Sequence, residues 1–572
     1  LVGSEMCIRD RKTAYADDAP CRPLDHHAVP CAGPTRAGVA HARSVAQSSP
    51  GPAAIDNEPP LVSNGAERAM SQSAPPHQDA ASTSRGIETA GIEIIGEDQR
   101  TARPRDLFLP WFAANISVFG MSYGAFILGF GVSFRQAVVA AVVGVIVSFL
   151  LCGIVAIAGK RGSAPTMVAS RAAFGVQGNK VPGIVSWVTS IGWETSLAIT
   201  AVLATATIFQ RLGWSSGTTV KVIAAIVVAV LIVLGAVAGY HIIMRMQTVL
   251  TWVTGIVTVI YVTMTIPHID WGVVTHLPDG PWQAGIGVMT MVMTGMGLGW
   301  INIAADWSRY QSRDASGSSI VLWNTVGGSL GPVVLITMGL LLAGSSQDLS
   351  EAIALDPVGA LATILPTWFL APFLLVAVLS LLSGAINGIY SSGLTLLSLG
   401  IRIPRPAASL IDGTILTIGT IYVVFLSPNF ISPFQSFLVT LGVPLAAWAG
   451  IMIADITLRQ KPYDDTDLFR SAGRYRAVDP VSMVSFLVCV AIGWGLVINQ
   501  YEGVSWNDWQ GYLLEPLGLG GRQGPWAYAN IGVIAALVLG FLLTVIGRRG
   551  IVRRQEAMAP STAVDAHASA GR

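Results

Sequence analysis

Twelve long apolar segments follow one another from residue 107 onward, and each is long enough to cross a lipid bilayer. A helix rises about 1.5 Å per residue, so roughly 20 apolar residues span the hydrocarbon core of about 30 Å. Only 12% of the residues are charged, whereas about a quarter are charged in ordinary soluble domains. We therefore predict an all-α integral membrane protein with twelve transmembrane helices. These are expected at 107–131, 136–158, 183–209, 220–239, 243–266, 284–305, 319–343, 366–390, 409–427, 432–455, 481–499 and 527–547.

The two ends of the chain differ in composition from this helical region. Residues 1–104 and 551–572 are rich in small and polar residues without an apolar period, which predicts disordered cytoplasmic tails. Residues 1–11 resemble translated adapter sequence, Met70 is a candidate native start, and no signal-peptide pattern is visible. Between the tails we expect three parts, namely a ten-helix transport core at 105–455, a cytoplasmic loop at 456–480, and helices 11 and 12 within 481–550.

Basic residues indicate how the helices are oriented. If the N-terminus is cytoplasmic, most Lys and Arg residues near the membrane fall on the cytoplasmic side. The outer side then holds only Arg135, Arg211, Lys221 and Arg522. Loops rich in Lys and Arg stay in the cytoplasm, so this orientation follows the positive-inside rule. We expect a multi-pass protein of the cell membrane with both termini in the cytoplasm.

One apolar segment carries a carboxyl group near its centre. Glu194 lies in the middle of the segment 183–209, directly after Trp193. A charged side chain at the bilayer centre costs roughly 2.5–3.5 kcal/mol on insertion scales, so it is usually paired, protonated or turned toward an aqueous cavity. Glu194 therefore predicts a polar site at the membrane midplane. The alternative is a structural carboxyl group that bonds a neighbouring helix.

The sequence lacks the patterns of a metal site, a catalytic site or a nucleic-acid interface. The five cysteines form no CxxC or Cys/His spacing, and no HExxH motif or basic nucleic-acid patch is present. No His pair lies in the apolar segments. We therefore expect neither an enzyme nor a cofactor-dependent protein, and no nucleic-acid partner. A membrane-embedded enzyme remains a less favoured alternative, as does a non-transporting membrane sensor.

Three stretches together resemble a known family. The first segment contains Trp111-Phe-Ala-Ala-Asn115, the sixth ends in Ala304-Ala-Asp-Trp-Ser-Arg-Tyr310, and the eighth contains Ser383-Gly-Ala-Ile-Asn387. They resemble the nucleobase–cation symporter-1 family, within its purine–cytosine permease branch, over about residues 105–550. The resemblance implies a leucine-transporter-like fold, which consists of five helices, an inverted repeat of five, and two more helices. In that fold helices 1 and 6 break at the midplane, where substrate and ion bind.

The resemblance also implies roles for individual residues. Trp193 matches the tryptophan that stacks on the substrate ring, and Asn387 resembles the family's substrate-binding asparagine. Glu194 would either accept hydrogen bonds from ring N–H groups or exchange a proton during transport. Gly295 and Gly297 weaken the sixth helix and permit close approach to its backbone. For these two glycines, tight helix packing is the alternative.

Two departures from the family pattern concern the ring-binding site. Leu197 stands where some relatives carry an amide, four residues after Trp193. The break expected in helix 6 carries Met296 and Leu298, where family members commonly have an aromatic residue. The sequence therefore leaves the stacking partner from helix 6 unidentified.

The coupling ion also stays open between H⁺ and Na⁺. A sodium site would combine the Ser380 and Ser383 hydroxyls with helix 1 carbonyl groups near Asn115 and Val118, because hard cations take oxygen ligands. Serines in membrane helices also commonly bond their own backbone, which is the alternative. Asn115 itself either binds a ligand or bonds a neighbouring helix. A titratable Glu194 favours protons instead.

Five further residues are expected to have structural roles. Trp187 is expected to pack against its neighbours. Asp306 and Arg309, three residues apart, share a helix face and can pair, and we expect them to serve topology and gating instead of contacting substrate. Asp412 and Asp455 are placed near cytoplasmic helix ends, where we expect them to be solvated.

The sequence as a whole predicts a secondary active transporter. It would take up a nucleobase such as a purine or cytosine, or a related heterocycle, together with H⁺ or Na⁺ by alternating access. Its partners would be this small-molecule substrate and the lipid bilayer. The alternative within transport is an amino-acid or amine permease of the same fold.

Overall fold

The structure is a computed structural model that describes residues 91–560 apart from 216, 428–430 and 500–508. The predictions for residues 1–90 and 561–572 lie outside the described residues. Residues 91–104 are ordered, although the composition assigns them to the disordered tail. Ile95 and Arg100 are buried there, and the Ile95 amide donates to the Ser163 carbonyl. Residues on the N-terminal side of the boundary expected at residue 105 therefore pack against the helices.

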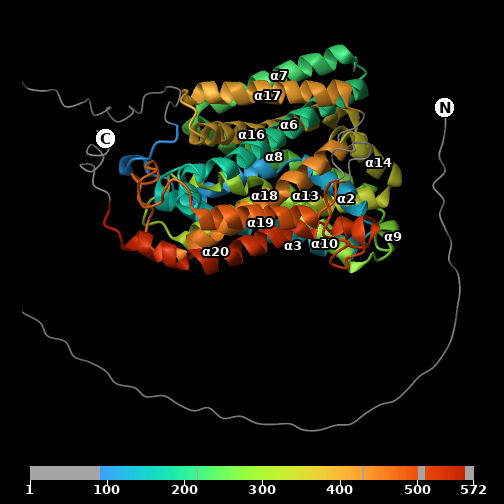
Figure 1. Cartoon of the computed structure of the whole chain (residues 1–572). Helices are drawn as coiled ribbons and strands as arrows, with labels where there is room; N and C mark the ends of the chain where they lie inside the picture. The colour runs from blue at the N-terminus through green and yellow to red at the C-terminus, as the bar shows by residue number, and fades with distance from the viewer. Residues whose placement is uncertain (1–90, 216, 428–430, 500–508, 561–572) are drawn as a thin grey trace, which may run out of the picture. The chain divides into compact units, whose positions relative to one another are not determined.

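The described chain is built almost wholly from helices (Figure 1). Among the described residues, ten helical segments are long and apolar enough to cross a membrane, one further span is a bent pair, and α19 (Pro480–Gly495) is a shorter apolar helix. This arrangement is consistent with the twelve predicted segments. The long helices are α3 (Phe134–Gly162), α6 (Lys180–Arg211), α7 (Thr218–Ala238), α8 (Tyr240–Thr265), α10 (Trp282–Gly295), α13 (Gly317–Ser345), α16 (Thr367–Ser398), α17 (Arg405–Leu426), α18 (Ile431–Leu458) and α20 (Ile531–Ala557).

The first segment is not a continuous helix. It divides into α1 (Phe108–Asn115) and α2 (Phe119–Leu128), and the two pieces are bent by 63°. Ile116 leaves the helical region with φ −82° and ψ 59°. Across the break the Ile116 amide still donates to the Phe112 carbonyl, and the Ser117 and Val118 carbonyls accept from the Gly120 and Met121 amides.

The sixth segment also breaks near its middle. After α10 (Trp282–Gly295), Met296 adopts φ −117° and ψ −115°, and a single turn α11 (Gly297–Trp300) follows. A 3-10 turn at Ile301–Ile303 then leads into α12 (Ala304–Ser308). The breaks in helices 1 and 6 that the resemblance implies are therefore both present.

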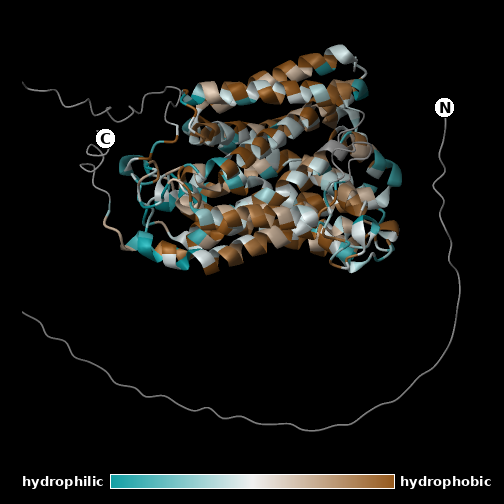
Figure 2. Cartoon of the chain, in the orientation of Figure 1, coloured by the Kyte–Doolittle hydropathy of each residue, from teal (hydrophilic) through white to brown (hydrophobic). Residues whose placement is uncertain are grey.

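Helix α6 lies between two other long helices and positions the candidate site. It packs against α16 along much of its length and against α17 on another side. Helices α7 and α17 lie side by side at the edge of the bundle (Figure 1). Their outward surfaces are apolar (Figure 2), with exposed side chains such as Leu234 and Ile418. These surfaces suit contact with lipid acyl chains, whereas α6 and α16 are mostly buried.

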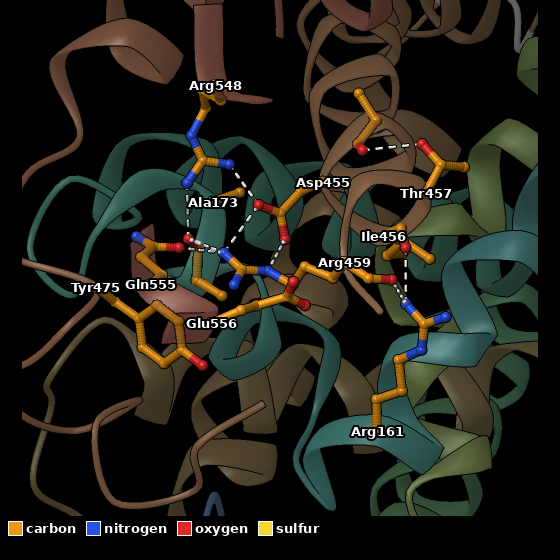
Figure 3. Close-up of polar contacts among 12 residues, drawn as sticks. Arg161, Ala173, Asp455, Ile456, Thr457, Arg459, Tyr475, Arg548, Gln555 and Glu556 are labelled. Atoms are coloured by element: carbon orange, nitrogen blue, oxygen red, sulfur yellow. Dashed lines mark hydrogen bonds and ion pairs between the residues drawn. The ribbon is translucent and has the colours of Figure 1, made fainter. Parts of the chain in front are cut away.

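A buried charge network joins the end of α18 to α20 (Figure 3) and also to the start of α19. Asp455 accepts from Arg459 Nε at 2.6 Å and also pairs with Arg548. Arg548 in turn lies 3.2 Å from Asp479, which begins α19. The exposed fraction of the Asp455 side chain is 0%. The expectation that Asp455 is solvated is therefore wrong, because α20 and the 460–479 segment cover the end of α18.

Candidate functional site

Trp193 lies beside the break in the sixth segment. A Cβ atom added at Gly299 would sit 2.8 Å from the indole Nε1 of Trp193, so the ring rests directly on the backbone of α11. Its other neighbours are two rings of α18, with centroids 5.4 Å away for Phe434 and 5.9 Å for Phe437, both edge-on. Trp193 is partly buried. α6 therefore brings the predicted stacking residue to the discontinuity.

Trp300, at the end of α11, is a second indole at the same break. Its ring lies 6.0 Å from that of Trp111 on α1, close to perpendicular. A Cβ atom at Gly384 on α16 would lie 3.8 Å from the Trp300 ring and 2.9 Å from Leu197. Trp300 is partly buried. Trp300 is thus an aromatic residue of helix 6 at the break, whereas the sequence analysis considered only Met296 and Leu298, both of which are buried.

Glu194 points toward α16, and its carboxyl group is buried without a hydrogen-bond partner among the described residues. Its exposed fraction is 1%, and a Cβ atom at Gly388 would lie 2.6 Å from its Oε1 atom. Within the described part of the chain, neither carboxyl oxygen has a hydrogen-bond partner. The glycine thus leaves the space that the carboxyl group fills, and Glu194 is a buried polar group free to bind something else.

Asn387 is held by a residue that our sequence analysis did not identify. Gln247 on α8 donates from Nε2 to Asn387 Oδ1 at 2.7 Å. The Oε1 atom of Gln247 accepts from Ser383 Oγ at 2.5 Å. All three side chains are buried. Gln247 therefore fixes the orientation of the Asn387 amide. Gln247 could have been found in the sequence as a lone amide side chain inside an apolar segment.

The residues considered for a cation site divide into two groups. Ser380 Oγ donates to Ser117 Oγ at 3.1 Å and to the Ala377 carbonyl at 2.9 Å. Ser380 thus meets the break in helix 1, immediately before Val118, which is the N-cap residue of α2. Ser383 instead bonds Gln247. The Asn115 side chain donates to the Trp111 carbonyl of its own helix at 2.8 Å.

The described residues contain no cluster of three or more His, Cys, Asp or Glu side chains that could hold a metal ion. Ser117, in the break between α1 and α2, and Ser380 on α16 bring two hydroxyl oxygens together. Neutral oxygen ligands of this kind are chemically suited to a hard cation.

Gly295 and Gly297 both lie in close helix contacts. A Cβ atom at Gly295 would come within 2.3 Å of the Tyr123 hydroxyl, and one at Gly297 within 2.2 Å of the Ser148 carbonyl carbon. The Gly297 amide, freed by the break, donates to Ser148 Oγ at 3.0 Å. These contacts favour the packing alternative for the two glycines.

The substitution Gly297→Ala is expected to destabilise the protein by about 1–3 kcal/mol, because the new methyl group overlaps the backbone of α3. The measurement is the free energy of unfolding in mixed detergent micelles. Gly285→Ala, where an added Cβ meets nothing within 4 Å, is the matched control in the same segment. Unchanged stability with weakened ligand binding would instead favour a substrate contact at Gly297.

Two further side chains differ from their expected roles. Asp412 on α17 is fully buried, so the expectation that it is solvated is wrong. It accepts from Trp187 Nε1 at 2.9 Å and from Ser392 Oγ at 2.7 Å. Trp187 therefore does more than pack. The expectation failed because α6 and α16 lie on either side of the N-terminal half of α17 and exclude water from it.

Asp306 and Arg309 have partners on other segments. Asp306 accepts from the Thr166 amide at 2.7 Å and from the Thr166 hydroxyl at 2.8 Å. Arg309 donates to the Gly91 carbonyl and to the Tyr390 hydroxyl, each at 2.9 Å. These bonds join the end of helix 6 to α4 (Thr166–Ala169), to α16 and to residue 91, as a structural role requires.

A pocket of about 500 Å³ opens near the start of α10. Phe126, Phe130 and Gln435 are among its lining residues. Phe434 connects this pocket to the indole site, since its ring centroid lies 6.4 Å from that of Phe126 and 5.4 Å from that of Trp193. Phe434 is buried. In this conformation the Phe434 ring therefore covers the side of Trp193 that is directed toward the pocket.

Comparison with known proteins agrees with this geometry. A family model described as permease for cytosine/purines, uracil, thiamine, allantoin matches residues 94–510. The chain is 23% identical over 424 residues to "Putative purine-cytosine permease YxlA" of Bacillus subtilis (strain 168), a match that covers 71% of this chain and 87% of the relative. The family resemblance read from the sequence is confirmed.

Solved structures share the fold. Mhp1, a nucleobase-cation-symport-1 family transporter in a closed conformation with bromovinylhydantoin bound, matches with a TM-score of 0.60 at 17% identity, over 84% of this chain and 98% of Mhp1. Its inward-facing conformation matches with a TM-score of 0.58 at 17% identity, over 82% and 96%. A Na⁺-coupled sialic acid symporter matches with a TM-score of 0.52 at 12% identity, over 82% and 92%. The leucine-transporter-like fold is confirmed.

Proposed function

Because the chain belongs to the family of permeases for cytosine/purines, uracil, thiamine and allantoin, we propose that it takes up a nucleobase or a closely related heterocycle with a coupled cation, by alternating access. The observation that carries this proposal is the pair of indoles at the break of helix 6. Trp193 rests on Gly299, and Trp300 is the next residue along the chain. The heterocycle would bind between the broken helices and α6.

The aromatic groups suit a planar ring. Trp193 would stack on the heterocycle, and Trp300 would contact it from the side of α1 and α16. Binding sites for such ligands combine apolar and aromatic walls with a few fixed polar groups. Leu197, at 2.9 Å from the Cβ position of Gly384, would add an apolar wall. Bromovinylhydantoin, the ligand bound to Mhp1, also contains a small ring.

The polar edge of the ring would meet two side chains. Asn387, whose Oδ1 is already bonded to Gln247, keeps its amide N–H groups for an acceptor on the ring. Glu194 would accept from a ring N–H group, because both of its oxygens lack a partner among the described residues. Together they would recognise a heterocycle that presents a donor next to an acceptor. A carboxylate substrate, as in an amino-acid permease, would be repelled by Glu194.

The direction of transport follows from the proposed orientation. The Lys and Arg distribution supports cytoplasmic termini in the cell membrane, so the pocket beside Phe130 and Gln435 would face outward. Phe434 would move to let substrate reach Trp193. The breaks in α1–α2 and α10–α11 are the natural hinges for such a change, because their backbone already departs from helical geometry.

Thermal unfolding of the purified protein tests the substrate class. We expect a purine or pyrimidine base, a hydantoin or allantoin to stabilise the protein, by about 2.7 kcal/mol when its concentration is 100 times the Kd. Each compound is screened with and without sodium, and sodium dependence would favour the Ser117–Ser380 site. Stabilisation by amino acids or amines instead of heterocycles would contradict the proposal and favour the alternative permease.

Uptake into proteoliposomes separates a carrier from a sensor. A compound that stabilises the protein should also accumulate inside vesicles when a proton or sodium gradient is imposed. A membrane sensor would bind the compound without moving it. Binding without uptake or exchange under either gradient would therefore refute transport.

A further inference from the structure

A second buried carboxyl group lies close to Glu194 and was not expected from the sequence. Asp412 on α17 is fully buried, and Ser392 lies one helical turn along α16 from Gly388, against which the Glu194 carboxyl group packs. Ser392 donates to Asp412 Oδ2 at 2.7 Å. One hydroxyl thus lies near both carboxyl groups, at the junction of α6, α16 and α17.

The spacing along each helix explains this arrangement. On α6, Trp187 and Glu194 are seven residues apart, so they lie two turns apart on one face. On α16, Gly388 and Ser392 are four residues apart and are neighbours on one face. Gly388 leaves room for Glu194, and Ser392, one turn further, reaches Asp412. Trp187 binds the other oxygen of Asp412 at 2.9 Å.

Among the other charged and titratable side chains of the surrounding helices, Arg405, Tyr390 and Asp455 bond other groups, and Tyr422 is exposed. Arg405 donates to the Ala236 and Val237 carbonyls and covers the ring of Tyr390. Tyr422 is 61% exposed. On the helices packed against α6, the charged and titratable side chains are Arg405, Asp412 and Tyr422 on α17, Tyr390 on α16, Lys221 on α7 and Asp455 on α18. Asp455 pairs with Arg459 and Arg548.

Two neighbouring carboxylates cannot both stay ionised at membrane depth without a compensating charge. Like charges at close range disfavour each other's ionised form, and each buried charge also loses its hydration. A pair of this kind titrates as a unit and keeps one proton between its members. The partnerless oxygens of Glu194 supply the acceptors that such a proton needs.

We propose that Glu194 and Asp412, linked through Ser392, form the binding site for a coupling proton. The inference rests on the proposed transport function and selects H⁺ over Na⁺ as the ion that drives it. Binding adds one proton to one carboxylate oxygen, and release returns the same proton to water on the other side of the membrane. Trp193 precedes Glu194 on α6, so the ring and the proton would bind at adjacent positions of one helix, and each binding event would affect the other.

Infrared difference spectroscopy tests the proton site without any substrate. The purified full chain is titrated with H⁺, and the carbonyl stretch of protonated carboxyl groups is followed. We expect a band that persists at neutral pH in the unmodified protein and disappears in both Glu194→Gln and Asp412→Asn. The control Glu351→Gln changes an exposed carboxyl group on α14 (Gln347–Leu355) and should keep the band. Absence of the band in the unmodified protein, or its survival in both single variants, would overturn the inference.

Transport measurements then test coupling, with radiolabelled cytosine and hypoxanthine as probes. In proteoliposomes, Asp412→Asn should lower accumulation driven by a pH gradient about 5- to 150-fold, while exchange of labelled for unlabelled base at equal pH continues. Asp412→Glu should restore accumulation in part, since it returns a carboxyl group. If Asp412→Asn does not fold, Ser392→Ala serves as the second variant and should shift the pH profile of uptake. Unchanged pH-driven accumulation in these variants would overturn the inference.

The two proposals fail in different ways. If the unmodified protein neither binds nor exchanges any base, the proposed transport function fails, and the infrared titration still decides whether the carboxyl pair holds a proton. If bases are exchanged and accumulation follows a sodium gradient alone, the transport function stands and the proton site is refuted.

Discussion

The substitution Trp193→Ala is expected to weaken binding of the heterocycle about 5- to 150-fold. Stacking of a nucleobase on an aromatic side chain contributes about 1–3 kcal/mol when measured by alanine substitution, and about 1.4 kcal/mol corresponds to tenfold in Kd. The indole rests on Gly299 and lies edge-on to Phe437, and both contacts remain when Phe434 moves aside, so the ring is held in place for the ligand. Equilibrium binding of the base that gives the strongest thermal stabilisation is the measurement.

A matched control separates stacking from a general loss of aromatic area. Trp368 lies near the start of α16 and is 69% exposed, so Trp368→Ala should leave the Kd unchanged. Trp300→Ala is expected to weaken binding as well, because Trp300 is the second indole at the break. If Trp193→Ala binds the base as tightly as the unmodified protein while remaining folded, the proposed ring site is wrong.

The substitution Asp455→Ala should destabilise the fold by about 3–5 kcal/mol, since removing one partner of a buried ion pair leaves an uncompensated charge. Asp455 faces two guanidinium groups, and the side chains of Arg459 and Arg548 are 3% and 0% exposed. Figure 3 shows both arginines directed at the same carboxylate. The measurement is the free energy of unfolding in mixed detergent micelles.

The expected loss is specific to the buried network. Asp348 lies in the first turn of α14 and is exposed, so Asp348→Ala should change stability little. A double substitution, Asp455→Ala with Arg548→Met, should recover part of the loss because it removes one of the two stranded charges. A loss below about 1 kcal/mol for Asp455→Ala would mean that water reaches the arginines and screens them.

The long helices were predictable because the signal that defines them is local. A run of about 20 apolar residues has a favourable transfer free energy into the bilayer whatever surrounds it. The structured helices therefore agree with the predicted segments to within a few residues for α7 and α13, whereas α16 continues to Ser398, beyond the predicted end at 390. Hydropathy identifies the apolar part of a helix, but α16 extends past it through small polar residues that are buried by neighbouring helices.

The breaks in helices 1 and 6 were harder to predict from the sequence. Periodicity treats 107–131 as one segment, and only the resemblance to a family implied that it divides. In the structure the freed Gly297 amide is satisfied by Ser148 on α3, far away along the chain. A break is tolerated at membrane depth when such a partner exists, and no local pattern reveals the partner.

The residues of the candidate site were likewise predictable from the sequence only in part. The residues Trp193, Glu194 and Asn387 were identified from the sequence, and the structure brings Trp193 to the break and turns Glu194 toward Gly388. Gln247 and Asp412 were missed, because each acquires its role from a helix more than a hundred residues away. Trp300 was missed because the expected aromatic position was sought at Met296 and Leu298.

The sequence by itself determined that this chain is a helical membrane protein with a costly carboxyl group inside it and, through its motifs, which family it resembles. The tertiary structure alone decided which groups surround the carboxyl group of Glu194, which acidic side chains are buried away from water, and which side chains complete the ring site. The physical reason is that transfer into lipid depends on the composition of one segment. Hydrogen bonds and ion pairs at membrane depth depend instead on which distant segments pack together.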